Sequence, residues 1–330
     1  MTRSEQCGSP ISPSSLLILA GPTGVGKSEL ALAVARRRGS EIIVADSMQV
    51  YRSLDIGTGK PSRAERREVP HHLVDACDPT ESFSAFAFAE RARQVVGEIQ
   101  ARGRLPILVG GTGLYLRAFL RGELAGGGGD PALRARLRAE AATHGTAALH
   151  ARLGRRDPAS AARIHPGDLF RIIRALELLE RTGERPSVLR PNLWDRPALP
   201  AAIFLVLTRE RDELYRRIDR RCRAMWQGGL LDEVRGLLLS GSSPQLRSLQ
   251  ALGYRQALAC LGGRLTEAEA LQAMQRTTKH YAKRQLTWFR REPAAEWVTV
   301  AGEDWVPPLV DAILHRLGGA EEKRDGSALG

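Results

Sequence analysis

The segment Leu16–Ser28 reads LLILAGPTGVGKS, and it decides the fold. Its first five residues are all apolar, as in a buried strand of a parallel sheet. The next eight fit the pattern G-x-x-x-x-G-K-[ST], and Lys27–Arg38 is predicted to be a helix. Because the pattern lies between a strand and a helix, it predicts a phosphate-binding loop, in which backbone amides and a helix N-terminus hold phosphate oxygens.

This loop, the P-loop, brings a charge and a metal ligand of its own. Lys27 adds a full positive charge, and the Ser28 hydroxyl can ligate Mg²⁺. The pattern does not identify the phosphate compound, because ATP and another pyrophosphate ester would both fit. The predicted phosphate site comprises Gly21, Pro22, Thr23, Gly24, Val25, Gly26, Lys27 and Ser28.

Short apolar runs recur further along the chain. Glu41–Ala45 and Pro106–Val109 are two of them, and Ser84–Arg102 between them has helical periodicity. Ile203–Leu207 is another such run. Short apolar strands that alternate with helices predict an α/β fold, here a P-loop-type parallel sheet covered by helices.

A long helical segment interrupts this alternation. The four glycines Gly126–Gly129 predict a flexible connector, and Pro131–Gly183 has helical patterns without a strand signal. We therefore expect an all-helical domain inserted into the α/β core, and helices again from Asp212 onward. The expected division is a disordered tail at 1–14, the core at 15–122 and 199–316, the helical insertion at 123–198 and a disordered tail at 317–330.

The chain of 330 residues is strongly basic, with a formal net charge of +12 and a pI of about 10.3. Such a charge often indicates a polyanionic partner, for example a nucleic acid. An arginine-rich and lysine-poor composition also reflects a GC-rich coding sequence. The positions of the charges must therefore decide between the two explanations.

No membrane-spanning or secreted segment is expected. The sequence has no apolar run long enough to span a bilayer, and its first residues lack the apolar core of a signal peptide. The four cysteines are widely spaced, which predicts neither a disulfide framework nor a zinc site. We expect a cytoplasmic protein that is a monomer.

Polar residues follow two of the apolar runs. Asp46 directly follows Glu41–Ala45, and Thr112 follows two glycines after Pro106–Val109. Ligands of parallel sheets bind at the carboxyl ends of the strands. Asp46 would support Mg²⁺ and water in a nucleotide hydrolase, or act as a general base in a group transferase. Thr112 suits a second phosphate contact, and it also suits a helix N-cap.

A helix predicted over Leu214–Met225 carries an arginine within its apolar stripe. At helical spacing, Arg221 falls on the same face as Ile218 and Cys222. A guanidinium on a buried face needs an anionic partner, because an unpaired buried charge is costly. That partner is either a structural carboxylate or the phosphate of a ligand.

Two basic segments are candidates for nucleic-acid contact. Arg171 and Arg174 are three residues apart on a predicted helix, and Lys279–Arg291 interleaves basic with aromatic residues. Such a mixture suits phosphate neutralisation together with base stacking. An amphipathic surface helix with an aromatic core face explains the second segment equally well.

Eight segments then occur together in a fixed order. They are GPTGVGKS at 21–28, DSMQVY at 46–51, DIGTGKP at 55–61, HHLVD at 71–75, VGGTGLY at 109–115, RALE at 174–177, GYR at 253–255 and KRQLTWFR at 283–290. In this combination the chain resembles the bacterial tRNA dimethylallyltransferases, also called tRNA isopentenyltransferases. The resemblance implies transfer of a dimethylallyl group from its diphosphate to the exocyclic amine of the adenosine just 3′ of the anticodon.

The resemblance also implies roles for single residues. Ser28 would hold Mg²⁺, Lys27 and Arg221 would stabilise the diphosphate, Asp46 would accept the amine proton, and Thr112 would touch the bridging oxygen. The implied partners are dimethylallyl diphosphate and the tRNA anticodon stem-loop. The positions that match tRNA contacts are Asp46, Ser47, Met48, Gln49, Thr112, Arg134, Phe170, Arg171, Ile172, Ile173, Arg174, Gln250, Gly253, Tyr254, Arg255, Lys283, Arg284, Gln285, Trp288 and Arg290.

The chain departs from the family pattern at two places. The family often has Gln-Arg where this chain has Phe170 and Arg171, so the family's glutamine lacks a counterpart here. The glycines Gly126–Gly129 stand in place of a linker that contains proline. Neither departure affects the residues expected to carry the chemistry.

Three other functions compete with prenyl transfer to tRNA. A small-molecule kinase explains Lys27, Ser28 and Asp46 but not the basic, aromatic segment near the C-terminus. An RNA-binding nucleotide hydrolase that acts as a switch gives Thr112 no purpose. An isopentenyltransferase for free adenine nucleotides would not need the inserted helical domain.

Overall fold

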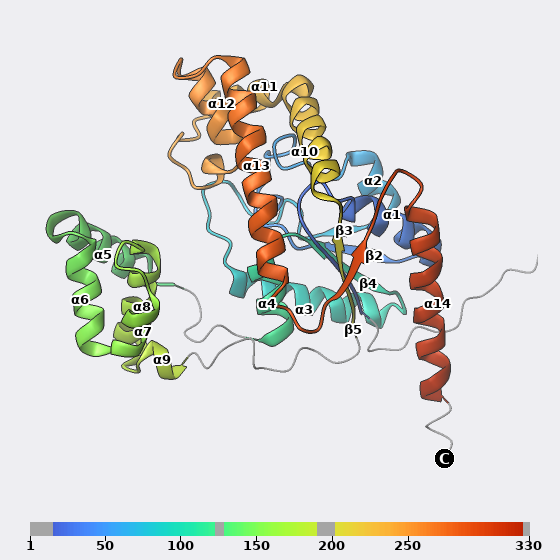
Figure 1. Cartoon of the computed structure of the whole chain (residues 1–330), viewed down its shortest axis with the longest axis horizontal. Helices are drawn as coiled ribbons and strands as arrows, with labels where there is room; N and C mark the ends of the chain where they lie inside the picture. Colours follow the sequence, from blue (N-terminus) through green and yellow to red (C-terminus); the bar gives the residue numbers. More distant parts are fainter. Residues whose placement is uncertain (1–15, 123–128, 190–201, 326–330) are drawn as a thin grey trace, which may run out of the picture. The chain divides into compact units, whose positions relative to one another are not determined.

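A computed structural model of the chain describes residues 16–122, 129–189 and 202–325. These residues form one parallel sheet with the strand order β3-β2-β4-β1-β5-β6 (Figure 1). The predicted α/β fold is therefore confirmed. The strands are β1 (Leu16–Ala20), β2 (Glu41–Val44), β3 (His71–His72), β4 (Pro106–Gly110), β5 (Ala202–Thr208) and β6 (Glu296–Thr299).

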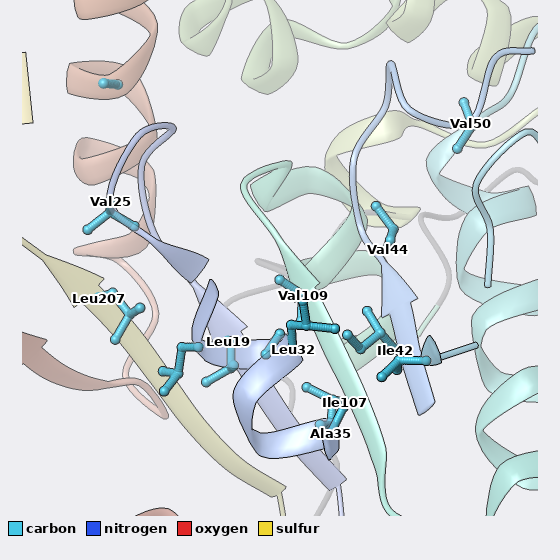
Figure 2. Close-up of a cluster of buried hydrophobic side chains, with 14 of the residues drawn as sticks. Leu19, Val25, Leu32, Ala35, Ile42, Val44, Val50, Ile107, Val109 and Leu207 are labelled. Atoms are coloured by element: carbon cyan, nitrogen blue, oxygen red, sulfur yellow. The ribbon is translucent and has the colours of Figure 1, made fainter. Parts of the chain in front are cut away.

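The central strand β1 is apolar throughout because both of its faces are covered. Leu17 and Leu19 belong to a core cluster shared with α1 (Lys27–Arg38) and α14 (Val306–Asp325). Ile18 points to the opposite face and is also fully buried. Figure 2 shows how side chains of β1, α1, β2, β4 and β5 meet in this cluster.

The strands and most of the helices form the first of two compact units, Met1–Arg117 with Leu199–Gly330. In this unit α13 begins at a capping box made by Thr266 and Glu269, and it packs against α10 and α12. Its other helices are α2 (Arg63–Glu68), α3 (Ala85–Ala101), most of α4 (Gly113–Arg121), α10 (Arg211–Met225), a π-helical turn (Trp226–Leu230), α11 (Leu231–Leu239), a 3₁₀ turn (Ser248–Gln250), α12 (Tyr254–Leu261) and α13 (Glu267–Phe289).

The second unit, Ala118–Ala198, is helical wherever the structure describes regular elements in it. Asp130, Asp157 and Asp168 cap three of its helices by accepting hydrogen bonds from backbone amides. Leu149 and Ile172 lie in a separate apolar core. The helices are α5 (Pro131–His144), α6 (Thr146–Arg156), α7 (Pro158–Arg163), α8 (Leu169–Thr182) and α9 (Pro186–Leu189).

Three features differ from the sequence-based expectation. The strand β6 lies in the region predicted to be helical after Asp212, and β3 was not predicted because it has only two residues. The helix α14 continues to Asp325, and Leu317 is buried, so the disordered tail expected from residue 317 is wrong for this part. The expected tail at 1–14 and most of the glycine connector lie outside the described residues. No described helix is long and apolar enough to cross a membrane.

Candidate active site

The P-loop joins β1 to α1 and needs its glycines. Gly21, Gly24 and Gly26 have φ angles of 139°, 82° and 112°, a region that favours glycine. A Cβ at Gly21 would also lie 2.5 Å from the carbonyl oxygen of Leu207 in β5. The Val25 side chain is buried in the core, so this residue offers the loop only its backbone (Figure 2). The geometry agrees with a cradle for phosphate at the start of α1.

Lys27 is held inside this loop. Its Nζ donates a hydrogen bond to the Pro22 carbonyl oxygen at 2.8 Å. Burial first and the positive charge of Arg221 second lower the pKa of Lys27 to about 7, and the negative charge of Asp46 opposes the shift. A bound anion would oppose this shift by supplying negative charge beside the ammonium group.

Asp46 follows β2 and lies beside Lys27 in the same cavity. Its Oδ1 accepts hydrogen bonds from the backbone amides of Met48 at 2.8 Å and Gln49 at 3.3 Å. These bonds fix the orientation of the carboxylate. Asp46 is thus a fixed anionic group close to two cations, which is suitable for a general base.

Thr112 links the ends of β2 and β4. Its Oγ1 accepts a hydrogen bond from the Ser47 amide at 3.1 Å, and it also bonds to Tyr281 of α13. Burial first and Asp46 second raise the pKa of Tyr281 to about 12, so its hydroxyl stays protonated at neutral pH. The predicted contact of Thr112 with a bridging oxygen stays a prediction, because its hydroxyl bonds within the protein here.

Arg221 differs from its expected position on a buried face. Leu214, Ile218 and Cys222 are buried, whereas the Arg221 side chain is exposed to the cavity at the edge of that stripe. The guanidinium lies so close to Gly59 that a Cβ there would be 2.0 Å from its Nη2. Protein surrounds it on most sides, so desolvation lowers its pKa, and Asp46 opposes the shift. Arg221 therefore faces the space that a ligand would occupy.

Residues of the P-loop, Asp46 and Arg221 line one cavity of about 720 Å³, which is within the usual size range for a small-molecule site. The P-loop, Asp46 and Arg221 meet there as predicted from the sequence, and their catalytic roles stay predictions. The sequence did not indicate several other lining residues, because only the tertiary fold brings them in. They are Lys60, Arg217, Arg220, Tyr281, Glu303 and Trp305.

Gln285 of α13 connects two of the ligand-facing loops. Its Oε1 accepts a hydrogen bond from the Thr23 amide at 2.9 Å, and its Nε2 donates one to the Gly111 carbonyl at 2.9 Å. The side chain is 6% exposed. Both ends of the Gln285 amide are engaged inside the protein, and its predicted contact with tRNA stays a prediction.

The segment Asp55–Gly59 forms another wall and is held by Glu233 of α11. The Glu233 carboxylate accepts hydrogen bonds from the backbone amides of Ile56 at 2.8 Å and Asp55 at 3.0 Å. It also accepts one from the Tyr254 hydroxyl at 2.6 Å. Tyr254 is fully buried and supports this wall through Glu233, and its predicted contact with tRNA stays a prediction.

Some of the predicted tRNA contacts in the helical unit are exposed and others are buried. Phe170 is 67% exposed, and the Arg171 side chain is 72% exposed. Ile172 and Ile173 are buried in the core of the unit, and their predicted contact with tRNA stays a prediction. The helical periodicity of α8 explains the difference in exposure, because adjacent residues point in different directions.

In the first unit, Gln250, Arg255, Lys283, Arg284 and Arg290 are exposed and therefore accessible to a large ligand. Trp288 is half-buried and lies beneath the Arg117 guanidinium, 4.6 Å from its ring centre. Ser47, Met48 and Gln49 are half-buried beside Asp46, and the Gln49 amide donates to the Thr58 carbonyl at 3.2 Å. Their contact with RNA stays a prediction.

A metal would find few protein ligands at this site. The described residues contain no group of three or more His, Cys, Asp or Glu side chains that could hold an ion. The Ser28 hydroxyl is exposed at the start of α1, beside Lys27. One protein oxygen fits Mg²⁺, which usually keeps several waters and binds through substrate phosphates.

The parallel sheet carries a P-loop with Lys27, a second cation at Arg221 and an aspartate just after β2. Together they define a P-loop enzyme for a phosphate-bearing substrate. A family model described as IPP transferase matches residues 49–292. The chain belongs to the IPP transferase family.

Individual relatives agree with this assignment. A tRNA dimethylallyltransferase of Syntrophobacter fumaroxidans is 48% identical over 286 residues, which is 87% of this chain and 84% of that protein. The structure of full-length tRNA isopentenylpyrophosphate transferase from Bacillus halodurans has a TM-score of 0.68 at 39% identity, covering 94% of this chain and 99% of its own. A eukaryotic dimethylallyltransferase, described as acting on tRNA, has a TM-score of 0.75 at 27% identity over 87% and 74% of the two chains.

Proposed function

We propose that this protein transfers a dimethylallyl group from dimethylallyl diphosphate to the exocyclic amine of the adenosine just 3′ of the anticodon of tRNA. The observation that carries the proposal is the meeting of Lys27, Arg221 and Asp46 around one cavity. Two cations can stabilise the negative charge of a diphosphate leaving group, and the carboxylate can accept a proton from the amine. The names of the relatives support tRNA as the acceptor and dimethylallyl as the group that is transferred.

The reaction is a displacement at carbon 1 of the dimethylallyl group. The amine nitrogen forms a bond to this carbon while the bond from the carbon to the diphosphate oxygen breaks. Diphosphate leaves with the bonding electron pair, and Asp46 accepts the proton that the nitrogen loses. The P-loop amides, Lys27 and Arg221 stabilise the negative charge that develops on the leaving group.

Mg²⁺ would add to this charge stabilisation when it is bound, and Ser28 would hold it together with the diphosphate oxygens. The chain's own groups do the remaining work. The hydrogen bonds from Met48 and Gln49 orient Asp46, and Gln285 fixes the P-loop against the end of β4. With Asp46 and the P-loop held in place, the only charge that the protein takes up during the reaction is the proton accepted by Asp46.

The RNA would contact the exposed basic and aromatic residues. The target adenosine must leave the stack of the anticodon loop to reach a carbon held inside the cavity. The exposed Lys283 and Arg290 on α13 would neutralise phosphates of the backbone. We infer that the helical unit clamps the anticodon stem-loop, with Phe170 and Arg171 on its accessible surface.

The direct test is label transfer. Purified protein is incubated with Mg²⁺ and radiolabelled dimethylallyl diphosphate, with either unmodified tRNA or AMP as acceptor. We expect label in tRNA and none in AMP. The Asp46→Ala variant should lose about 10²- to 10⁴-fold in transfer rate, as is typical for a general base. Asp232→Ala, on the exposed surface of α11, is the matched control and should transfer at the normal rate.

Two results would replace the proposal. Transfer to AMP instead of tRNA would indicate an enzyme for free adenine nucleotides. Absence of transfer to either acceptor, together with phosphoryl transfer from ATP, would indicate a kinase.

A further inference from the structure

Two arginines hold successive carbonyl oxygens of the P-loop. The Nε of Arg217, in α10, donates a hydrogen bond to the Gly24 carbonyl oxygen at 2.9 Å. The Nε of Arg209, just after β5, donates one to the Val25 carbonyl oxygen at 3.1 Å. These side chains follow the loop by 193 and 184 residues in the sequence, so the motif itself does not indicate them.

Arg209 is buried and is fixed from several sides. It is 5% exposed, and its Nη1 donates to the Gly302 carbonyl oxygen at 3.2 Å and forms an ion pair with Glu213. Its guanidinium also lies 5.3 Å from the centre of the Trp305 ring. Arg209 does not line the cavity of the candidate active site, so any contact effect on a ligand must pass through the loop.

Arg217 lines this cavity and is partly enclosed. Its side chain is 24% exposed, and its ion pair with Glu29 is long, at 3.8 Å. Burial first and the positive charge of Arg209 second lower the pKa of Arg217. The bond to the Gly24 carbonyl oxygen is shorter than the contact with Glu29, so the side chain is held mainly by the loop backbone.

The two peptide groups that these arginines hold each adjoin a glycine. Gly24 and Gly26 have φ angles of 82° and 112°, and glycine can adopt many other backbone conformations at little steric cost. The peptide groups on either side of Val25 can therefore rotate more easily than peptide groups between larger residues. A hydrogen bond to each carbonyl oxygen opposes this rotation.

The orientation of each carbonyl group also determines the direction of an amide, because the C=O and N–H of a trans peptide point in opposite directions. Arg217 therefore turns the Val25 amide, and Arg209 the Gly26 amide, away from the guanidinium groups. In the described part of the chain the Gly26 amide has no acceptor, and the Val25 amide has a long bond of 3.4 Å to the Pro22 carbonyl oxygen. Both amides can thus donate to a phosphate oxygen.

We propose that Arg209 and Arg217 are positioning residues for a diphosphate group in the P-loop. They hold the loop, before a ligand binds, in the orientation in which the Val25 and Gly26 amides face the phosphate oxygens. Donors oriented in advance stabilise negative charge without reorientation during the reaction. The inference rests on the proposed function, because the diphosphate group it names is that of the prenyl donor.

The test replaces each arginine with lysine, which keeps the positive charge and loses the planar guanidinium. Arg209→Lys still allows an ion pair with Glu213, but one ammonium group cannot reproduce the bonds of Nε and Nη1 together. Calorimetric titration with inorganic diphosphate and Mg²⁺ measures the affinity of each variant at a temperature where thermal unfolding shows it to be folded. Arg211→Lys, exposed at the start of α10, is the matched control.

We expect Arg209→Lys and Arg217→Lys each to bind inorganic diphosphate roughly tenfold more weakly, as for the loss of one hydrogen bond to a charged group. The kcat for prenyl transfer should fall about 10²-fold, as for one misplaced donor to a developing oxyanion, and affinity for tRNA should be unchanged. Arg211→Lys should behave as the wild type. Wild-type affinity for diphosphate in a lysine variant, whatever its stability, would overturn the inference for that arginine, because its charge or its structural role would then suffice.

Label transfer by the wild type separates this inference from the proposed function. Transfer to tRNA, together with wild-type diphosphate affinity in both lysine variants, would retain the function and remove the positioning role. Weakened diphosphate binding in the variants, without transfer by the wild type, would retain the positioning role and remove the prenyl-transfer proposal.

Discussion

Single charged residues determine what the P-loop can bind. Lys27 is enclosed by protein and close to Arg221, and for these reasons its pKa is lowered to about 7. Close to neutral pH the free protein is therefore a mixture of two protonation states of one lysine. A diphosphate favours the protonated state, so ligand binding and proton uptake are linked.

This linkage predicts a measurable proton uptake. At pH 8, above the lowered pKa, Lys27 is mostly neutral in the free protein and gains a proton when dimethylallyl diphosphate binds. At pH 6, below the pKa, it is already protonated, so the uptake at this residue should vanish. Calorimetric titration in buffers of different ionisation enthalpy measures the number of protons taken up.

The matched variant is Lys27→Arg, because an arginine stays charged at both pH values. We expect binding by this variant with no uptake at pH 8. An uptake that persists in Lys27→Arg would assign the proton to another group.

The close approach of Gly110, at the end of β4, to Ala45, just after β2, gives a second prediction for a single residue. A Cβ at Gly110 would lie 2.0 Å from the Ala45 carbonyl oxygen, and neither backbone is free to move far between β2 and β4. Gly110→Ala should reduce the free energy of unfolding by about 1–3 kcal/mol, as overpacking does. Urea denaturation measures this change.

The control for Gly110→Ala is Gly97→Ala in the middle of α3, where a Cβ would meet nothing within 4 Å. It should raise the free energy of unfolding by about 0.5–1 kcal/mol, because alanine is the better helix former. Equal effects of the two substitutions would contradict the argument from close approach.

Among the secondary-structure elements, α13 does more for the site than its surface pattern indicates. Its basic and aromatic residues suggested RNA contact, but Gln285 on the same helix turns inward and bonds to Thr23 and Gly111. Gln285→Ala removes both bonds and leaves the partly buried Thr23 amide and the buried Gly111 carbonyl unpaired. We expect a loss of about 2–6 kcal/mol in the free energy of unfolding, from roughly 1–3 kcal/mol for each unpaired group.

Activity should separate a positioning role from a purely structural one. At a temperature where Gln285→Ala is fully folded, kcat for prenyl transfer should fall at least tenfold, because the P-loop is no longer fixed against the end of β4. Affinity for tRNA should be unchanged. Thr287→Ala, exposed on the same helix, is the control. A loss of tRNA affinity with unchanged kcat would return Gln285 to RNA binding.

The sequence predicted those elements whose cause is local. The apolar run of β1, the glycines of the P-loop and the helical pattern of α10 each identified an element before the structure was known. The strand β6 was missed because Glu296–Thr299 is mostly exposed and has no continuous apolar run. β6 is extended because it pairs with β5, and this pairing partner lies far away in the sequence. The local sequence around β6 therefore does not predict the strand.

The candidate site follows the same division. Lys27 and Asp46 were found because each directly follows a recognisable strand or loop. Arg221 was predicted on the correct helix but on its buried face, whereas its side chain is exposed to the cavity. An idealised helix does not show that Gly59, on another segment, leaves space for the guanidinium. Tyr281 and Gln285 meet the P-loop across more than 250 residues of sequence, so only the fold brings them there.

In the whole molecule, the net charge of +12 says little about RNA binding until the cations that lie in ion pairs are excluded. Glu41 alone binds Arg102 and Arg104, and Glu296 binds Arg316, so these arginines lie in ion pairs at the surface. Lys283 and Arg290 are exposed without an ion pair among the residues described. Long-range attraction of RNA therefore depends on a subset of the cations.

The dependence of tRNA affinity on salt should identify this subset. Each cation that contacts a phosphate releases counterions, so log K falls linearly with log salt concentration. Lys283→Ala and Arg290→Ala should each weaken binding and reduce the magnitude of this slope by about 1. Arg316→Ala removes the same charge from α14 and should leave the slope unchanged, because its guanidinium is already paired with Glu296. If all three variants reduced the slope equally, the net charge and not the position of these residues would govern the binding of tRNA.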